Sequence, residues 1–142
     1  MKTNEDMLSH ILKTTQMGQS GIRCVMDYAQ NDELRNALKA SLQEYDEIEK
    51  EALNIAGKHN YNVNELAPVT KKMASMMSKM KLQYGDAQSK IADMMILGNT
   101  RGIIKGIRNQ HQWEQRDDSV DALTQRLLEY ENDNINEMKK FL

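Results

Sequence analysis

Apolar residues recur every three or four positions along most of this chain, and that spacing restricts its fold more than any other feature. The clearest run is Leu34, Leu38, Ser41, Tyr45, Ile48, Ala52 and Ile55. Near the C-terminus a second run predicts the inner face of another helix; it consists of Val120, Leu123, Leu127, Glu131, Asn134, Met138 and Phe141. Such a repeat is that of an amphipathic helix, whereas a half-buried strand alternates every second residue. A content of 1 Pro and 1 Phe beside 11 Met is also unlike that of a sheet protein. The sequence therefore predicts an all-α chain.

The same periodicity divides the chain into five expected helices, at about 4–30, 32–59, 65–83, 90–114 and 119–141. Thr3 followed by Asp6 is typical of a capping box, and Asn60 is expected to end the second helix in the left-handed conformation. Asp86 or Ser89 is expected to cap the fourth helix, and the fifth is expected to start at Asp118 or Ser119. Long helices joined by short turns predict one antiparallel bundle over residues 1–142.

Charge and hydropathy indicate a cytoplasmic protein without affinity for nucleic acid or membranes. The formal net charge of −2 gives no general attraction to polyanions. Apolar runs are far shorter than the roughly 18 residues of a membrane span, and the first residues lack the apolar stretch of a signal peptide. The single cysteine, Cys24, fits a reducing compartment.

Three segments carry a family resemblance: "MGQSGI" at 17–22, "YGDAQSKIADMM" at 84–95 and "RLLEYENDNINEMKKF" at 126–141. Together with the order of long and short helices, they make the chain resemble the ferritin-like superfamily. The closest likeness is to small bacterial bundles of unknown function, some of them stress-associated. The resemblance implies a ferritin-like antiparallel four-helix bundle with one helix broken or an extra fifth helix.

The resemblance also allows a test for a metal site. Di-metal members of the superfamily use Glu from two helices and Glu-x-x-His from two others. None of the histidines here, His10, His59 and His111, follows a glutamate by three positions. Gln19 stands where related bundles place an inward Glu, and Met94 to Leu97 stand where they place acidic residues. We therefore expect no metal and no cofactor. If a metal were bound, the candidate ligands would be Glu44, Glu47 and Glu131.

Gly98, Gly102 and Gly106 form a ladder with a spacing of four in the fourth helix. They do not fit a Walker loop, and Arg101 and Lys105 exclude a membrane face. Glycines on one helix face let another backbone approach closely. Because this helix is apolar on several faces, we expect an interface through the three glycines, Ile103 and Ile107 in a homodimer. Close packing inside one bundle is an equally weighted alternative.

Two further groups have a plain and a functional interpretation. Six methionines at helical spacing favour core filling over a Cu(I) site or an adaptable groove; they are Met73, Met76, Met77, Met80, Met94 and Met95. Glu131, Glu44, Tyr45 and Gln19 favour a satisfied buried network over a remnant polar site.

Three functional hypotheses follow. The first is a non-enzymatic, homodimeric module that acts through protein contacts or in a stress response. The second is a divergent di-metal carboxylate protein that handles iron or oxygen. The third is a carrier of a small hydrophobic ligand, which requires an unfilled cavity.

Overall fold

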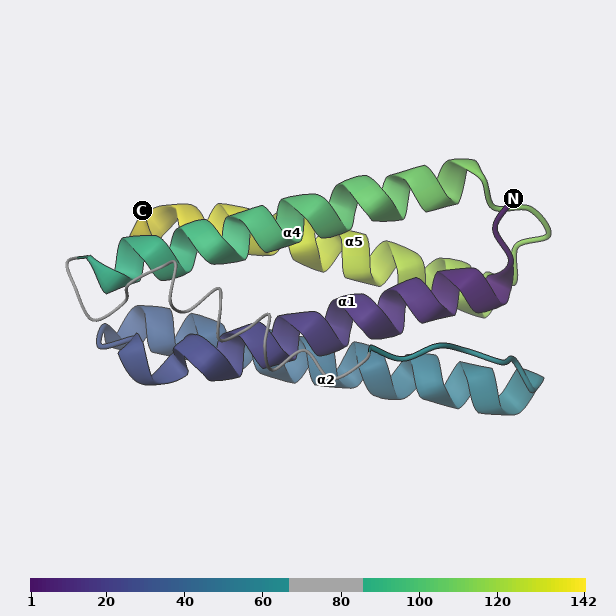
Figure 1. Ribbon diagram of the computed structural model, residues 1–142, viewed down its shortest axis with the longest axis horizontal. Coiled ribbons are helices and arrows are strands. Elements are labelled where there is room, and N and C mark those ends of the chain that lie inside the picture. The colour runs from purple at the N-terminus through teal and green to yellow at the C-terminus, as the bar shows by residue number, and fades with distance from the viewer. Residues whose placement is uncertain (67–85) are drawn as a thin grey trace.

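The computed structural model of the chain describes residues 1–66 and 86–142, whose helices form an elongated bundle (Figure 1). The long helices are α1 (Asn4–Val25), α2 (Asp32–His59), α4 (Ala87–His111) and α5 (Asp118–Met138). Short 3-10 turns extend α1 over Met26–Tyr28 and α5 over Lys139–Phe141. The described part of the chain contains no strand, which confirms the all-α prediction. The helix expected at 65–83 lies outside the described residues, apart from its first two positions, which are not helical.

Local sequence explains where most helices begin and end. The Thr3 side chain accepts a hydrogen bond from the Asp6 backbone N–H at 3.1 Å, and the Asp6 carboxylate accepts one from the Thr3 N–H at 2.9 Å. This confirms the predicted capping box. Asn60 ends α2 with φ 55°, as predicted, and Asp86 caps α4. α5 begins at Asp118, one of the two predicted starts, and Asp117 caps it.

The predicted bounds of the fourth helix were wrong, because α4 ends at His111 rather than at residue 114. The reason is tertiary. The side chain of Asn4, at the start of α1, accepts hydrogen bonds from Trp113 Nε1 at 3.1 Å and from the Asp117 backbone N–H at 3.0 Å. Lys2 N also donates to the Gln112 carbonyl at 2.7 Å. These hydrogen bonds link the α4–α5 connection to the N-terminal segment. The connection adopts a non-helical conformation to make them, and α4 therefore ends at His111.

The chain order gives the bundle one long crossover. α1 with α2, and α4 with α5, form antiparallel pairs, whereas α2 and α4 run in the same direction (Figure 1). The chain after α2 therefore has to return along the bundle. Residues 61–66 make the start of this return beside α1. The Asn64 N–H donates to Ser9 Oγ at 2.9 Å, and the Leu66 N–H donates to Gln16 Oε1 at 2.8 Å.

The buried core follows the predicted helix faces. The α2 run from Leu34 to Ile55 is buried at every predicted position. The α5 run is buried from Val120 to Met138, whereas its last predicted member, Phe141, is half-buried. Burial of apolar surface is the main favourable term in folding, so these faces hold the bundle together. The packing is uneven, however. Among the antiparallel neighbours, α1 and α4 contact each other least.

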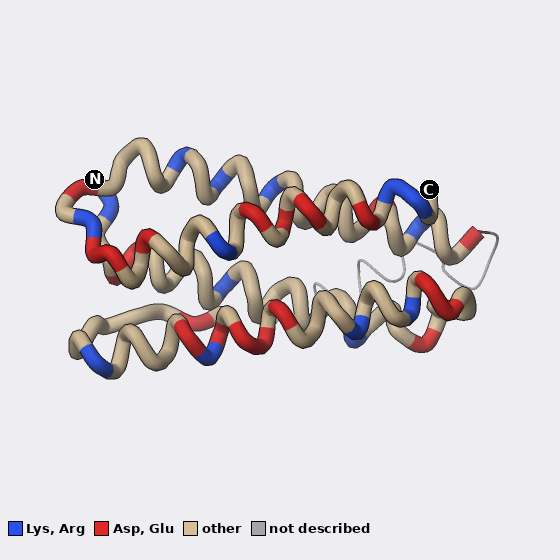
Figure 2. Tube along the Cα trace, turned by 180° about the vertical axis from the view of Figure 1, so that it is seen from behind, with Lys and Arg blue, Asp and Glu red and all other residues tan. Residues whose placement is uncertain are grey.

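Charge is also distributed unevenly over the helices. Figure 2 shows Lys and Arg along α4, and Asp and Glu along α2 and α5. Arg126 of α5 binds two acids of α2, with its Nε 2.9 Å from Glu44 Oε1 and its Nη2 2.9 Å from Glu47 Oε2. α4 carries Lys90, Arg101, Lys105 and Arg108 but a single acid, Asp93. Its outer surface is therefore the basic side of the bundle.

Candidate ligand cavity between α1 and α4

A cavity of about 530 Å³ lies between α1 and α4, the loosely packed pair of helices. Small-molecule sites in proteins commonly have volumes of about 300–1,000 Å³. Two glycines of α1, Gly18 and Gly21, and two of α4, Gly98 and Gly102, line this space. Because glycine has no side chain, these four residues leave space between α1 and α4 that larger residues would fill.

The four glycines serve two different purposes. Among the described residues, a Cβ at Gly98 would meet no atom within 4 Å, and one at Gly21 would meet only Met94 Cε, at 4.0 Å. The described part of the chain therefore leaves room for side chains at these two positions. A Cβ at Gly18 would instead lie 2.5 Å from the ring of Tyr45, and one at Gly102 would lie 2.5 Å from Glu131 Oε2. Gly18 and Gly102 therefore make room for polar side chains from α2 and α5, which form the floor of the cavity.

Glu131 is the least satisfied group of this floor. Only 1% of its surface is exposed. Its Oε1 has no hydrogen-bond partner among the described residues, and its Oε2 has only a long contact with Asn99 Nδ2, at 3.5 Å. Burial raises the pKa of this carboxyl to about 8, because the charged form is poorly solvated there. Near neutral pH Glu131 is thus mainly protonated and can donate as well as accept a hydrogen bond.

A chain of hydrogen bonds continues from the floor across the core. Asn99 Nδ2 donates to the Tyr45 hydroxyl at 2.9 Å, and Asn134 Nδ2 donates to Asn99 Oδ1 at 2.8 Å. Ser41 Oγ donates to Asn134 Oδ1 at 3.3 Å, and the Tyr130 hydroxyl donates to Ser41. Buried polar groups without partners are costly, and these bonds satisfy groups from α2, α4 and α5 together. The network holds the cavity floor in place.

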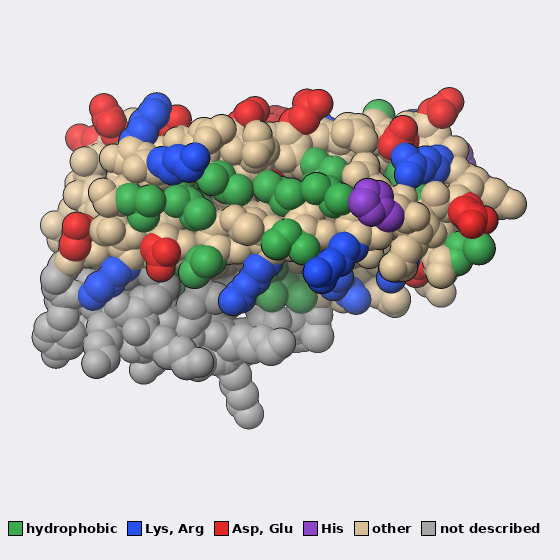
Figure 3. Space-filling view, turned by 90° about the horizontal axis from the view of Figure 1, so that it is seen from above, with side chains coloured by type: hydrophobic (Ala, Val, Ile, Leu, Met, Phe, Trp, Pro, Cys, Tyr) green, Lys and Arg blue, Asp and Glu red, His purple; other side chains and the backbone are tan. Residues whose placement is uncertain are grey.

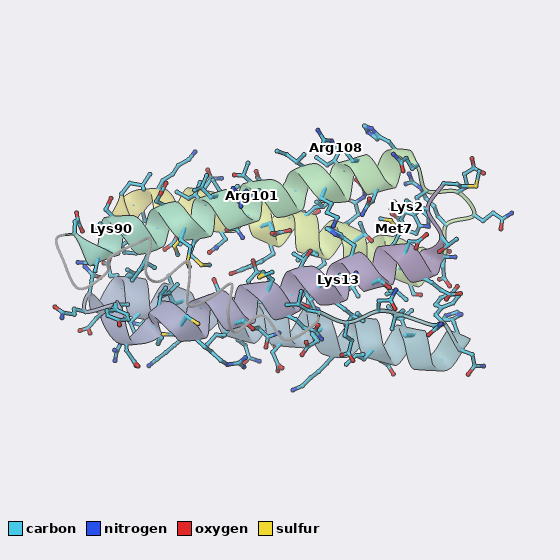
Figure 4. The ribbon with its side chains drawn as sticks, viewed as in Figure 1. Lys2, Met7, Lys13, Lys90, Arg101 and Arg108 are labelled. Carbon is cyan, nitrogen blue, oxygen red and sulfur yellow. The ribbon has the colours of Figure 1, made fainter. Side chains whose placement is uncertain are left out.

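Cations surround the opening of the cavity. Lys13 of α1 and Arg101 and Lys105 of α4 line it and are exposed. Figure 4 shows Lys13 and Arg101 on the two helices that flank the space. None of the three has an ion pair within residues 1–66 and 86–142. His10 also lines the cavity, and its pKa is lowered to about 4 by burial and by the nearby charges of Lys105 and Lys2. The histidine is therefore neutral near pH 7.

The structure separates the residues that were considered as metal ligands. Glu44 and Glu47 lie on the surface and bind Arg126, whereas Glu131 is buried at the cavity floor. In the described residues, no group of three or more His, Cys, Asp and Glu side chains could hold a metal ion. Of the four residues of the expected polar network, Tyr45 and Glu131 lie together, and Gln19 is buried without lining the cavity.

The residues of the expected interface have different surroundings. Gly102 and Gly106 pack within the chain, Gly106 against Leu128 and His10. Gly98 and Ile107 are exposed, and Ile103 is half-buried. Sequence reasoning missed Asn99 as a member of the polar network. The available signal was its helical spacing from Met95 and Gly106, both on the inner face of α4.

Three comparisons with known proteins complete this description. No family model, no curated protein and no solved structure matches the chain. None of the described helices is long and apolar enough to cross a membrane.

Proposed function

We propose that the protein is a non-enzymatic, small-molecule-binding helical bundle whose ligand occupies the cavity between α1 and α4. One observation carries this proposal: glycines keep about 530 Å³ open above a buried carboxyl that has an unpartnered oxygen. The space is partly open to solvent, so its apolar walls are exposed to water, which is unfavourable. A bound molecule would cover those walls, so the third sequence hypothesis is now the favoured one.

The same proposal includes a ferritin-like origin and a cytoplasmic location. Ferritin-like bundles have one long crossover connection, and here α2 and α4 are parallel, so the chain between them has to span the bundle. Glu131 faces the interior from α5, the direction in which carboxylates of that superfamily point. Cys24 as a free thiol suits a reducing compartment. The interior of such a bundle would here serve for binding rather than for metal chemistry.

Replacing Gly21 with Leu is expected to block the cavity. The backbone has room for a Cβ at this position, and the longer side chain would enter the space beside Met94. The uncharged dye N-phenyl-1-naphthylamine should bind the wild type saturably, with a rise in fluorescence. Its affinity for the Gly21→Leu variant should fall roughly tenfold or more, equivalent to about 1.4 kcal/mol.

The matched control for this test is Gly57→Leu. Gly57 lies near the end of α2 and does not line the cavity, and a Cβ there would meet no atom of residues 1–66 and 86–142 within 4 Å. Dye binding by this variant should equal that of the wild type, and circular dichroism should show that both variants remain helical. Failure of the folded wild type to bind the dye saturably, or an equal loss in both variants, would contradict the proposal.

A second candidate function, homodimer formation, is favoured by the outer face of α4. Leu97, Ile104 and Ile107 are 50%, 46% and 40% exposed. Figure 3 shows a band of hydrophobic side chains on this face, bordered by charged residues of both signs, with Asp and Glu predominant along the upper edge and Lys and Arg predominant along the lower edge. Exposed apolar patches commonly mark interfaces. A twofold axis parallel to the helices would place the basic edge of one copy against the acidic edge of the other.

Replacing Ile104 with Glu is expected to abolish this dimer, because a charge would be buried at its centre without a partner. Light scattering at low micromolar concentration should give the mass of a dimer for the wild type and of a monomer for the variant. Leu53→Glu is the control, since Leu53 is similarly exposed, at 42%, but lies on α2. A wild-type protein that remains monomeric would remove this candidate.

A further inference from the structure

The register of α1 against α4 sets the direction of the cavity. A Cβ at Gly21 would lie 4.0 Å from Met94 Cε, and a Cβ at Gly106 would lie 3.4 Å from His10 Nε2. Because the helices are antiparallel, the N-terminal half of α1 faces the C-terminal half of α4. The lining residues of α1 extend from His10 to Gly21. At 1.5 Å per residue, this stretch is about 16 Å long, so the cavity is a slot along the helices.

The two ends of the slot differ in chemistry. Lys13 and Lys105 line the end that contains His10, and the charge of Lys105 is close enough to lower the His10 pKa. Arg101, the third lining cation, lies one helical turn before Lys105 in α4. Met94 and Met95 line the opposite end beside Gly21. Thioether side chains are apolar and adapt to the shape of a ligand. The slot is therefore cationic at one end and apolar at the other.

Glu131 lies between these ends. Its carboxyl occupies the place that a Cβ would take at Gly102, which lies about one helical turn, or roughly 5 Å, from Lys105 along α4. Among the lining residues that the structure describes, it is the only acid. A protonated carboxyl with an unpartnered oxygen suits a neutral polar group on the ligand, such as a hydroxyl. Because Oε1 is itself buried, the carboxyl has to turn toward the cavity to make this bond. A purely hydrocarbon chain would leave this group without a partner, which costs free energy.

We infer that the ligand is a single-chain amphiphilic carboxylate with a hydroxyl group a few atoms from its head. The head lies between Lys13 and Lys105, where it receives charge-assisted hydrogen bonds. The hydroxyl bonds to Glu131, and the hydrocarbon tail runs past Gly18 to Met94 and Met95. This inference depends on the proposed binding function and adds the chemical class of the ligand.

Isothermal titration calorimetry with three dodecyl probes, below their micelle concentrations, tests the inference on the full chain. We expect 3-hydroxydodecanoate to bind most tightly, dodecanoate about tenfold more weakly, and dodecyltrimethylammonium weakest of all, since one lost hydrogen bond is worth about 1.4 kcal/mol. In Glu131→Leu the two carboxylates should bind equally. Equal affinity of both carboxylates for the wild type would overturn the assignment of Glu131.

Charge-reversal substitutions test the proposed binding of the carboxylate head at the cationic end of the slot. Lys13→Glu/Lys105→Glu should weaken carboxylate binding by roughly 100-fold, at about 1.4 kcal/mol for each lost charge-assisted bond. The control, Lys39→Glu/Lys58→Glu, changes the net charge equally at exposed positions of α2 and should bind as the wild type does. Unchanged binding after reversal at Lys13 and Lys105 would overturn the inference. The uncharged naphthylamine dye separates the two proposals: if it binds the wild type but no carboxylate does, the cavity function stands and the ligand class is wrong.

Discussion

Gly102→Ala is expected to lower the free energy of unfolding by about 1–3 kcal/mol, the usual cost of overpacking a filled site. The new Cβ would lie 2.5 Å from Glu131 Oε2 and 2.8 Å from Oε1. Glu131 is only 1% exposed, so its carboxyl has to give up its position against α4. Urea denaturation followed by circular dichroism measures the change.

Gly98→Ala is the matched control, four residues earlier in the same helix. A Cβ there meets no atom within 4 Å in the part of the chain that the structure describes, so we expect only helix propensity to change, and the variant should gain up to about 1 kcal/mol. A double-mutant cycle identifies the cause. In a Glu131→Ala background the steric conflict is absent, and Gly102→Ala should no longer destabilise. Equal effects of Ala at positions 98 and 102 would show that Glu131 does not require the glycine.

The free energy of unfolding should fall as the pH rises from about 6.5 to 8. Burial raises the folded-state pKa of Glu131 to about 8 from an ordinary 4.5. The stability that this group contributes is complete below pH 4.5 and is lost as the pH rises through 8. His10 acts in the opposite sense, because its folded pKa is lowered to about 4 from 6.5, and its contribution is lost as the pH falls. The two slopes oppose each other up to pH 6.5, and above it the Glu131 slope remains.

The expected loss between these pH values is about 1–2 kcal/mol, since one proton corresponds to about 1.4 kcal/mol per pH unit. Denaturant titrations at half-unit pH steps measure it. Glu131→Gln, which keeps the shape but cannot ionise, should flatten the curve in this range. Glu129→Gln, at an exposed position two residues away in α5, should leave the slope unchanged. A wild-type curve that is flat from pH 6.5 to 8 would contradict the assignment.

The fold was largely predictable because it depends on local patterns. The helical repeat identified the buried faces of α2 and α5, and Thr3, Asp6 and Asn60 fixed two helix ends. The end of α4 was not predictable, since it depends on hydrogen bonds to Asn4, more than 100 residues away. Local propensity contains no information on such contacts.

The cavity could not be found from the sequence for a related reason. From glycines at a spacing of four, one can infer only that one helix face has no side chains. The structure shows that Gly102 holds a carboxyl and Gly106 packs on Leu128, whereas Gly98 borders open space. Which of these outcomes occurs depends on what the opposite helix presents. Glu131 was recognised as inward-facing by its place in the α5 repeat, but its missing partner became visible only with Asn99 and Tyr45 in place.

The bonds of Asn4 also determine how α1 and α4 can separate. They link the beginning of α1 to the connection that follows α4, so hydrogen bonds hold the two helices together at that end. If α1 and α4 separate to admit a ligand, we expect them to rotate apart about the end that Asn4 holds. The separation would then be largest at the opposite end, where Gly21 faces Met94.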